Sequence, residues 1–387
     1  MAAHVFPAFA VILPLLHCPA PPAFPLHTAS AHLVDSGGHR VRLNAVNWYG
    51  AESPDFVVGG LASSTPAIIA RLIRELGFNA VRLPWSSQML ESNPVVGAYA
   101  LTANPDLQGQ TAMQIFDQVV NALAAEHLMI ILDNHSSDAE WCCGDDGNTL
   151  WANTAYPEAS WIRDWQAMAQ RYANQPYVIG ADLRNEPRIN ATWGGSPATD
   201  WNAAAARGGN AVLAVNPNLL IFVEGVNYAT DLSGAATLPV NLDVPDRLVY
   251  SAHDYGFDYS GLSGPTDWIE QIAPRWGYLV TGPAPQPFWL GEFGTCNTAG
   301  SCVGSVWFSA ISSYLGEYKV DWSYWPMNGT QSTGATRTFG APETYGILSP
   351  DWSTSALPSL ITALQELQTH GGAIGPARRG VGCPAVY

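Results

Sequence analysis

Short apolar runs alternate with longer segments of helical periodicity along most of the chain. Each apolar run is bounded by turn or polar residues, which is typical of a buried strand. The segments between them repeat apolar positions at the spacing that forms one face of a helix. In the first of these segments, 66–76, Gly77 follows as an expected helix C-cap. The pattern therefore predicts strands that alternate regularly with helices.

Eight runs are predicted as core strands and seven segments as helices. The strands are 42–48, 79–85, 128–135, 177–181, 219–224, 247–255, 288–292 and 320–325. The helices are 66–76, 111–127, 160–173, 201–215, 265–277, 306–317 and 355–369. A β-hairpin, with its turn at Ser36-Gly37-Gly38, is expected over 32–41. This order predicts the α/β fold class, as a single-domain (β/α)8 TIM barrel with a short N-terminal β-hairpin.

The alternative architecture is an open, doubly wound sheet. That fold would call for a glycine-rich phosphate loop after the first strand, and Asn47-Trp48-Tyr49-Gly50 is not one. No linker, low-complexity run or internal repeat divides the chain. We therefore expect one catalytic domain over residues 32–387 and no appended sugar-binding module.

Residues 1–31 have the features of a secretory signal peptide. The apolar stretch from Val5 to Leu16 is too short to span a membrane, and Ala29-Ser30-Ala31 fits a small-x-small cleavage site. The region before the stretch carries no Lys or Arg. A lipoprotein anchor at Cys18 is disfavoured because His17 does not suit that site. No later segment is long and apolar enough to span a membrane, so we expect a secreted protein without a membrane partner.

Composition narrows the class of ligand. Charged residues make up 12% of the chain, and the formal net charge is -16. This balance argues against nucleic acid, whose phosphates need a basic face. It suits a neutral substrate, and the 15 Trp and 15 Tyr residues offer rings on which sugars stack, although most of them are expected in the core.

The cysteines are expected to form disulfides that stabilise loops. Of six cysteines, loss of Cys18 with the leader would leave Cys142, Cys143, Cys296, Cys302 and Cys383, so at least one would be free or paired with another chain. Cys296 and Cys302 flank a short glycine-containing loop and are the expected pair. Adjacent Cys142 and Cys143 are not expected to bond to each other. No paired Cys-x-x-Cys pattern indicates a metal site.

Two glutamates follow apolar strands about a quarter of the chain apart. Glu186 lies in Asn185-Glu186-Pro187, after the strand 177–181, and Pro187 cannot continue a sheet ladder. Glu292 ends the strand 288–292. The carboxyl ends of barrel strands carry the catalytic groups of this fold. A pair of carboxyl groups is what double-displacement glycoside hydrolysis needs, so we predict Glu186 as acid/base and Glu292 as nucleophile.

Other strand ends supply groups that suit this chemistry. Arg82 is expected to keep Glu292 ionised, and Tyr255 to donate a hydrogen bond to the same carboxylate. Asn185 is expected to hold the sugar 2-hydroxyl, an interaction that strengthens in the transition state. Glu224 and Asp133 also end strands, and a structural role is the expected one for both.

Histidines and tryptophans complete the predicted substrate-binding set. His135 and His253 are expected to hydrogen-bond the sugar or a glutamate. Trp325 is expected to form the floor under the sugar ring at the cleavage point. Trp48 is the candidate for a further sugar subsite, although such a tryptophan more often packs a loop.

The order of these residues resembles glycoside hydrolase family 5, a family of clan-A barrels. The family pattern has Arg after strand two, His after strand three, Asn-Glu-Pro, His-x-Tyr, a second Glu and a Trp after strand eight. This chain matches it at Arg82, His135, 185–187, 253–255, Glu292 and Trp325, and the resemblance runs from about residue 31 to about residue 367.

Segments 104–109, 216–225 and 248–255 are similar to the bacterial endo-β-1,4-glucanases (cellulases) of that family. The resemblance implies retention of anomeric configuration, an open cleft, and neither cofactor nor metal. The implied ligand is a β-linked polysaccharide or oligosaccharide, and we expect a monomer.

Two segments depart from the family pattern, namely 140–146 and 330–342. They leave the glycan preference open, so a β-mannanase or another β-glycan hydrolase of the family stays an alternative. A catalytically inactive sugar-binding barrel is disfavoured because both glutamates and Arg82 are intact. A metal-dependent barrel hydrolase would want His-x-His after strand one, where this chain has Asn47-Trp48, and we expect a chelator to leave activity unchanged.

Overall fold

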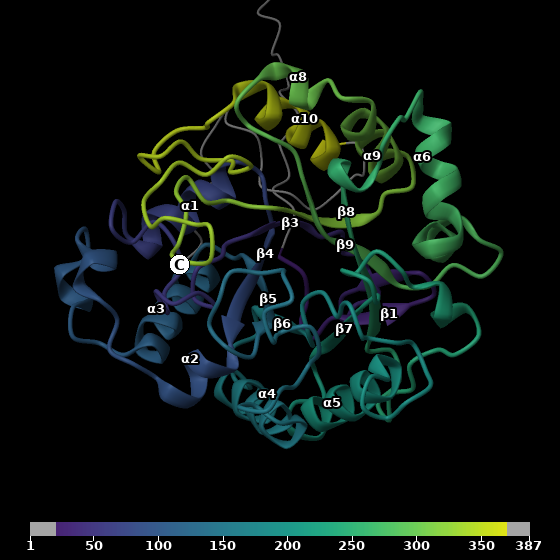
Figure 1. Ribbon diagram of the computed structural model, residues 1–387, viewed down its shortest axis with the longest axis horizontal. Helices are drawn as coiled ribbons and strands as arrows, with labels where there is room; N and C mark the ends of the chain where they lie inside the picture. Colours follow the sequence, from purple (N-terminus) through teal and green to yellow (C-terminus); the bar gives the residue numbers. More distant parts are fainter. Residues whose placement is uncertain (1–20, 370–387) are drawn as a thin grey trace, which may run out of the picture.

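A computed structural model describes residues 21–369, and eight parallel strands at its centre close into a barrel (Figure 1). Neighbouring strands follow chain order, and the last pairs with the first. This arrangement confirms the predicted (β/α)8 fold. The strands are β3 (Asn44–Asn47), β4 (Ala80–Ser86), β5 (Met129–Ser136), β6 (Val178–Asp182), β7 (Leu220–Glu224), β8 (Leu248–Tyr255), β9 (Phe288–Gly294) and β10 (Asp321–Tyr324).

Helices surround the barrel in the order that the periodicity predicts (Figure 1). They are α1 (Pro66–Glu75), α2 (Ser87–Ser92), α3 (Ala112–Ala125), α4 (Glu158–Arg171), α5 (Trp201–Val215), α6 (Pro265–Ile272), α7 (Tyr278–Thr281), α8 (Gly300–Val303), α9 (Val306–Glu317) and α10 (Pro358–Thr369). The predicted helix 265–277 is α6 continued by a π-turn, η5 (Ala273–Gly277). The short helices α2 and α8 are additional to the prediction, because one or two turns leave little periodicity to detect.

Local sequence explains where a typical helix begins and which face it buries. At α1, the Thr65 side chain accepts the backbone N–H of Ile68, and Pro66 occupies the first helical position, where its missing donor costs nothing. Ile69 and Ile73, one turn apart, are fully buried against the barrel. Side-chain caps also begin α5, at Asp200, and α9, at Ser305, and each of these helices likewise buries apolar side chains.

A small hairpin closes the N-terminal mouth of the barrel. It pairs β1 (His27–Ala29) with β2 (His32–Val34) in antiparallel register. Leu26 and Leu33 join the apolar cluster that fills this end of the barrel, so the opposite mouth is left for a site. The predicted hairpin over 32–41 is reduced to a single bridge between Val34 and Arg40.

The hairpin also bears on the predicted leader. Residues 1–20 lie outside the described part of the chain. A cleavage after Ala31, however, would remove β1 and the buried Leu26, both of which are integral to the fold. The predicted leader, its cleavage site and the boundary at residue 31 stay predictions. Within residues 21–369, no helix combines the length and apolar composition needed to cross a membrane.

The cysteines differ from the prediction in one respect. Cys296 and Cys302 form a disulfide, as predicted. Cys142 and Cys143 also form one, which corrects the expectation that these adjacent cysteines do not bond to each other. No cysteine within residues 21–369 is free. Cys18 and Cys383 lie outside the described residues.

Asp164, on the inner face of α4, is a buried carboxyl without a matched cation. It is 5% exposed, and its Oδ2 has no hydrogen-bond partner within the described chain. Burial, reinforced by repulsion from Glu91, raises the pKa of Asp164 to about 7. The unfolded chain releases the same proton near pH 4. Between these pH values the folded state binds more protons, so the free energy of unfolding falls as pH rises.

We expect Asp164→Asn to remove this dependence. The melting temperature of the variant should match that of the wild type near pH 4 and exceed it at pH 7, by about 2–4 °C for each kcal/mol recovered. Thermal unfolding at both pH values measures the difference, with surface Asp106→Asn as the matched control. A gain of equal size at both pH values would show that Asp164 is not the titrating group.

Candidate active site

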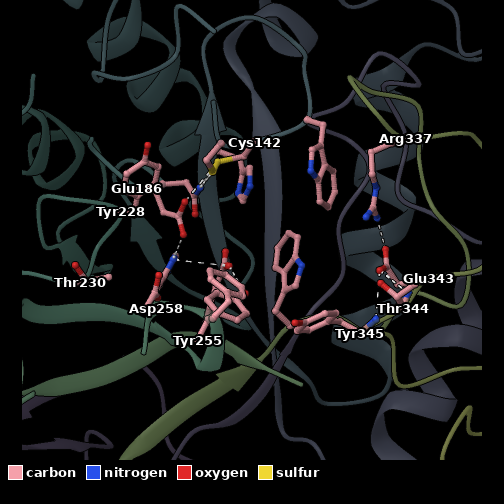
Figure 2. Close-up of a pocket in the computed structure, with 18 residues that line it drawn as sticks. Cys142, Glu186, Tyr228, Thr230, Tyr255, Asp258, Arg337, Glu343, Thr344 and Tyr345 are labelled. Atoms are coloured by element: carbon pink, nitrogen blue, oxygen red, sulfur yellow. Dashed lines mark hydrogen bonds and ion pairs between the residues drawn. A yellow bond between two sulfur atoms is a disulfide. The ribbon is translucent and has the colours of Figure 1, made fainter. Parts of the chain in front are cut away.

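A pocket of about 500 Å³ opens among the loops that follow the carboxyl ends of the barrel strands (Figure 2). Most of the predicted site residues line it. They are Glu186, Glu292, His135, Asn185, His253, Tyr255 and Trp325. Arg82 lies beneath the pocket floor and is fully buried. Residues up to two hundred positions apart in the chain therefore meet at one mouth of the barrel.

The two glutamates face each other across this pocket. One carboxylate oxygen of Glu186, one of Glu292 and a ring nitrogen of His253 all lie within 4.8 Å of one another. This spacing is close to the roughly 5–5.5 Å of retaining glycosidases and well short of the roughly 6.5–9.5 Å of inverting ones. The gap leaves no room for a water molecule that attacks from the far side of a sugar.

Glu292 is held by three hydrogen-bonding or charged groups. Arg82 donates from Nη1 to Oε1 at 2.6 Å, and the Tyr255 hydroxyl donates to Oε2 at 2.9 Å. His253 Nδ1 lies 3.7 Å from Oε2. Burial raises the pKa of Glu292, while the positive charges of His253 and Arg82 limit that rise. The Arg82 and Tyr255 contacts fix the position of this carboxylate, and both donors favour its ionised form.

Arg82 connects this carboxylate to a buried acidic layer. Burial alone would lower the pKa of Arg82, but the surrounding carboxylates raise it well above its ordinary value. Its guanidinium contacts four of them at 2.6–3.1 Å, namely Asp133, Asp182, Glu224 and Glu292. Loss of the guanidinium would leave these charges unpaired in a dry interior, which is far more costly than loss of a surface ion pair.

Asn185 is oriented by the same guanidinium. Its Oδ1 accepts a hydrogen bond from Arg82 Nη2 at 2.9 Å. The amide nitrogen therefore points into the pocket, where it donates to the Cys142 sulfur at 3.3 Å. Because sulfur is a weak acceptor, this donor remains available to a stronger acceptor such as a hydroxyl.

Glu186 stands on an unusual backbone conformation that a second glutamate holds. Its φ is +46°, in the left-handed region that residues with a side chain rarely occupy. The backbone N–H of Glu186 donates to Glu224 Oε2 at 2.7 Å. Although burial opposes ionisation, the charges of His253 and Arg82 lower the pKa of Glu224 to about 2. Glu224 is thus an ionised anchor that positions Glu186 from below.

The His253 imidazole contacts the side-chain carboxylates of both Glu186 and Glu224. Its Nδ1 lies 2.9 Å from Glu186 Oε1, and its Nε2 lies 3.3 Å from Glu224 Oε1. Burial alone would lower the pKa of His253, but Glu224 and then Glu292 raise it well above the ordinary value. The imidazolium therefore stays charged between three carboxylates.

Trp325 lines the pocket, and two neighbouring rings lie nearly parallel to its own. Tyr49 lies parallel to it at a centroid distance of 5.2 Å, and His135 at 5.6 Å. His135 is fixed in turn by a 2.6 Å contact between its Nδ1 and Asp133. The stack leaves an aromatic face, which is the surface that the apolar face of a sugar ring prefers.

Trp48 is the predicted residue that the structure does not bring to the pocket. It is fully buried, and its indole N–H donates to the Gly59 carbonyl. Asn47 points into the barrel, where its amide donates to Gly291, so the next side chain must point outward. Tyr49, one position further on, returns to the site and stacks on Trp325. Successive side chains of an extended chain point in opposite directions, and this alternation is the sequence pattern that separates Tyr49 from Trp48.

Two loops that the prediction left without a role also line the pocket. Trp141, Cys142 and Cys143 come from the segment after β5, and Arg337 and Glu343 come from the segment after β10. Figure 2 shows Cys142 near Glu186, with Arg337 and Glu343 across the pocket. Loops have no periodicity, so no sequence pattern indicated that these side chains point inward.

Within residues 21–369, three clusters of His, Cys, Asp or Glu side chains have the spacing of metal ligands, and each is already engaged. Arg82 supplies the positive charge among Asp133, Asp182 and Glu224. His253 does so between Glu186 and Glu292. In the third cluster, the two sulfurs of Cys142 and Cys143 are joined to each other, so no thiolate is offered beside Glu186.

Comparison with known proteins matches residues 34–331 to the family described as cellulase (glycosyl hydrolase family 5). An endoglucanase of Paenibacillus polymyxa is 37% identical over 85% of this chain and 83% of its own length. The major extracellular endoglucanase of Xanthomonas campestris pv. campestris is 34% identical over 90% of this chain and 72% of its own length.

Solved structures agree with these relatives. The catalytic domain of the Xanthomonas enzyme superposes with a TM-score of 0.77 at 33% identity and covers 89% of this chain and 99% of that domain. An endocellulase from Pyrococcus horikoshii, in a complex with cellotetraose, gives a TM-score of 0.77 at 28% identity and covers 90% of this chain and all of that one.

Proposed function

The chain belongs to glycosyl hydrolase family 5, and from that membership we propose an endo-acting β-1,4-glucanase that retains anomeric configuration, with Glu292 as nucleophile and Glu186 as acid/base. The observation that carries the proposal is the approach of the two carboxylates to within 4.8 Å in one pocket, in unlike surroundings. Unlike surroundings let one carboxyl ionise while the other carries the proton.

The contacts assign the two roles. Glu292 receives the Arg82 guanidinium and the Tyr255 hydroxyl, which both favour the anion that attacks the anomeric carbon. Glu186 contacts neither of these donors. Within residues 21–369 its carboxylate pairs with His253, and the Cys142 sulfur, which has no hydrogen to donate in the disulfide, lies 3.6 Å away. We assign to Glu186 the proton that the leaving oxygen takes up.

The reaction then proceeds in two displacements. Glu292 forms a covalent bond to the anomeric carbon as Glu186 protonates the departing oxygen, and the bond to the leaving sugar breaks. Glu186, now ionised, removes a proton from water, which attacks the anomeric carbon and releases Glu292. Asn185 directs its amide donor toward the sugar 2-hydroxyl, and Trp325 supports the ring.

The substrate class rests on the relatives and on the shape of the site. Both sequence relatives described above are named endoglucanases, and the Pyrococcus structure holds cellotetraose. The aromatic side chains that line the pocket offer the apolar surface on which a sugar ring stacks. We therefore place β-1,4-linked glucan ahead of mannan or other β-glycans.

Product analysis on a panel of soluble cellulose derivative, mixed-linkage glucan, mannan and xylan tests this assignment. We expect the highest kcat/KM on the two glucans, with a rapid fall in viscosity before many reducing ends appear. A preference for mannan would reassign the substrate, and release of one small sugar from chain ends without loss of viscosity would contradict endo action.

Tyr255→Phe tests the donor set around Glu292. Removal of the hydroxyl should raise the pKa of Glu292 further, because the donor stabilises the ionised form. We expect kcat/KM to fall about 10- to 100-fold, the scale of a hydrogen bond to a charged group, and the acid limb of its pH profile to move to higher pH. An acid limb that stays in place would argue that another group controls it.

We also propose that the enzyme acts outside the cell. The name of the Xanthomonas relative and the two disulfides support this, since disulfides persist in oxidising compartments. In a secreting host, full-length expression should deliver the activity to the medium, and activity confined to the cells would contradict the proposal.

A further inference from the structure

The two loops that depart from the family pattern meet beside the pocket. The Glu140 carboxylate accepts the backbone N–H of Ala335 at 2.8 Å. Gly334 packs so closely on Trp141 that an added Cβ would lie 2.4 Å from the Cβ of the tryptophan. Segments almost two hundred residues apart therefore form one continuous wall, and a glycine permits the contact.

Trp141 is the centre of this wall. The Arg337 guanidinium carbon lies 3.8 Å from the centroid of its ring, a cation–π contact that covers part of the indole. Tyr49 approaches the same ring at 5.2 Å, edge to face. Trp141 is only half-buried and lines the pocket, so the rest of its surface faces the space that substrate would occupy.

Arg337 is itself fixed. It pairs with the buried carboxylate of Glu343 and donates to the Tyr49 hydroxyl at 2.7 Å. The Tyr49 hydroxyl also donates to Glu343 at 2.5 Å. A loop residue with no such support would not hold an aromatic ring in one orientation, whereas this cluster sets the position of Trp141 before substrate arrives.

The position of the wall relative to the acid determines which sugar it would meet. Figure 2 shows Glu186 on one side of the pocket, and Arg337 and Glu343 on the other. The leaving sugar departs on the side of the acid that protonates it. The Trp141 ring lies 3.8 Å from the Arg337 guanidinium, so this part of the wall lies on the opposite, non-reducing side of the ring at the cleavage point. Cys142 of the same loop lies beside Glu186.

Trp141 also continues the aromatic surface of the floor. Its ring centroid lies 6.1 Å from that of Trp325, with the two planes inclined by 54°. Neighbouring rings at this spacing offer successive surfaces to successive sugars of one chain. The incline makes Trp141 a side wall, not a simple extension of the floor.

We propose that Trp141, held by Arg337, binds the glucosyl residue that precedes the ring at the cleavage point and so makes the enzyme depend on at least two linked glucosyl units on that side. The inference rests on the proposed function and assigns a specificity-determining residue to a loop outside the family pattern. Trp141 does not take part in bond cleavage.

The test compares two substrates with the same activated leaving group. A 2,4-dinitrophenyl β-glucoside fills only the cleavage position, whereas the matching β-cellobioside adds the glucosyl unit that Trp141 would bind. We expect Trp141→Ala to lower kcat/KM on the cellobioside about tenfold or more, the scale of one lost stacking contact. The value on the glucoside should stay within about twofold of the wild type.

Two further variants separate recognition from damage to the fold. Trp141→Phe keeps a ring and should recover most of the cellobioside activity. Trp193→Ala removes another half-buried loop tryptophan, one that does not line the pocket, and should leave both substrates unchanged. Equal losses of Trp141→Ala on both substrates, or no loss on either, would overturn the proposal.

The wild type distinguishes this inference from the proposed function. If the wild type cleaves neither the cellobioside nor soluble cellulose derivative, the proposed function fails. If it cleaves both and Trp141→Ala shows no selective loss, only the inference about Trp141 fails.

Discussion

Glu292→Gln is expected to lower turnover on soluble cellulose derivative by roughly 10³-fold or more, the scale of removing a catalytic group. An amide has nearly the volume of the carboxylate, and its one oxygen can still accept the hydrogen bond from Arg82, while its NH2 group can donate to the Tyr255 oxygen. It cannot form the ester-like bond to the anomeric carbon. The loss should therefore appear in kcat with an activated aryl cellobioside as well as with polymer, because both substrates need the nucleophile.

Folding must be shown to survive this change. The melting temperature of Glu292→Gln should stay close to that of the wild type, and exposed Glu270→Ala on α6 serves as the control carboxylate. Near-normal turnover by a folded Glu292→Gln enzyme would refute the assignment of the nucleophile.

Glu186→Ala is expected to divide substrates by their leaving group. A natural glucan releases a poor leaving group and needs the proton, so its kcat/KM should fall about 10²- to 10⁴-fold. A 2,4-dinitrophenyl cellobioside leaves without protonation, so its kcat/KM, which reports the first displacement, should fall far less. Steady-state kinetics on cellotetraose and on the aryl cellobioside measure the two effects.

A small anion provides the matching control for Glu186→Ala. Azide needs no general base to attack the covalent intermediate, so it should raise kcat of the variant on the aryl substrate and yield a β-glycosyl azide. It should not do so for Glu292→Gln. Equal slowing of both substrates, with no response to azide, would count against Glu186 as the acid/base.

The barrel was accessible from the sequence because its strands are buried on both sides. Runs such as 128–135 and 219–224 are apolar up to their polar carboxyl ends, so burial and strand are indicated by the same residues. Their last positions, at His135 and Glu224, must then meet at one mouth, since parallel strands end on the same side. That reasoning placed the two glutamates and most of their neighbours in one pocket.

The sequence did not reveal how the charges are shared. Arg82 was expected to support Glu292 alone, yet its guanidinium also contacts Asp133, Asp182 and Glu224. Glu224 was expected to be structural, and its contact with the Glu186 backbone depends on a left-handed residue that no pattern indicates. Such contacts form only when the barrel closes and brings distant strands together. They produce no periodic pattern in the sequence.

Loops account for the remaining differences. The cis peptide that joins Cys142 to Cys143 and the contact of Gly334 with Trp141 both depend on loop conformations. The N-terminal hairpin was predicted over 32–41 and not over its observed strands, because His27–Ala29 lies in a segment whose small and apolar residues also fit a leader. These segments do not determine the fold class, but they shape the walls around the conserved chemistry of the barrel mouth.

A covalent trap tests the central claim most directly. A 2-deoxy-2-fluoro cellobioside with an activated leaving group should slow release of the glycosyl-enzyme enough for intact-protein mass spectrometry to detect it. We predict one added cellobiosyl mass per chain and, after digestion, a label on Glu292. A label on any other residue would contradict this assignment. Complete hydrolysis to products of inverted configuration, with no covalent adduct, would contradict it as well.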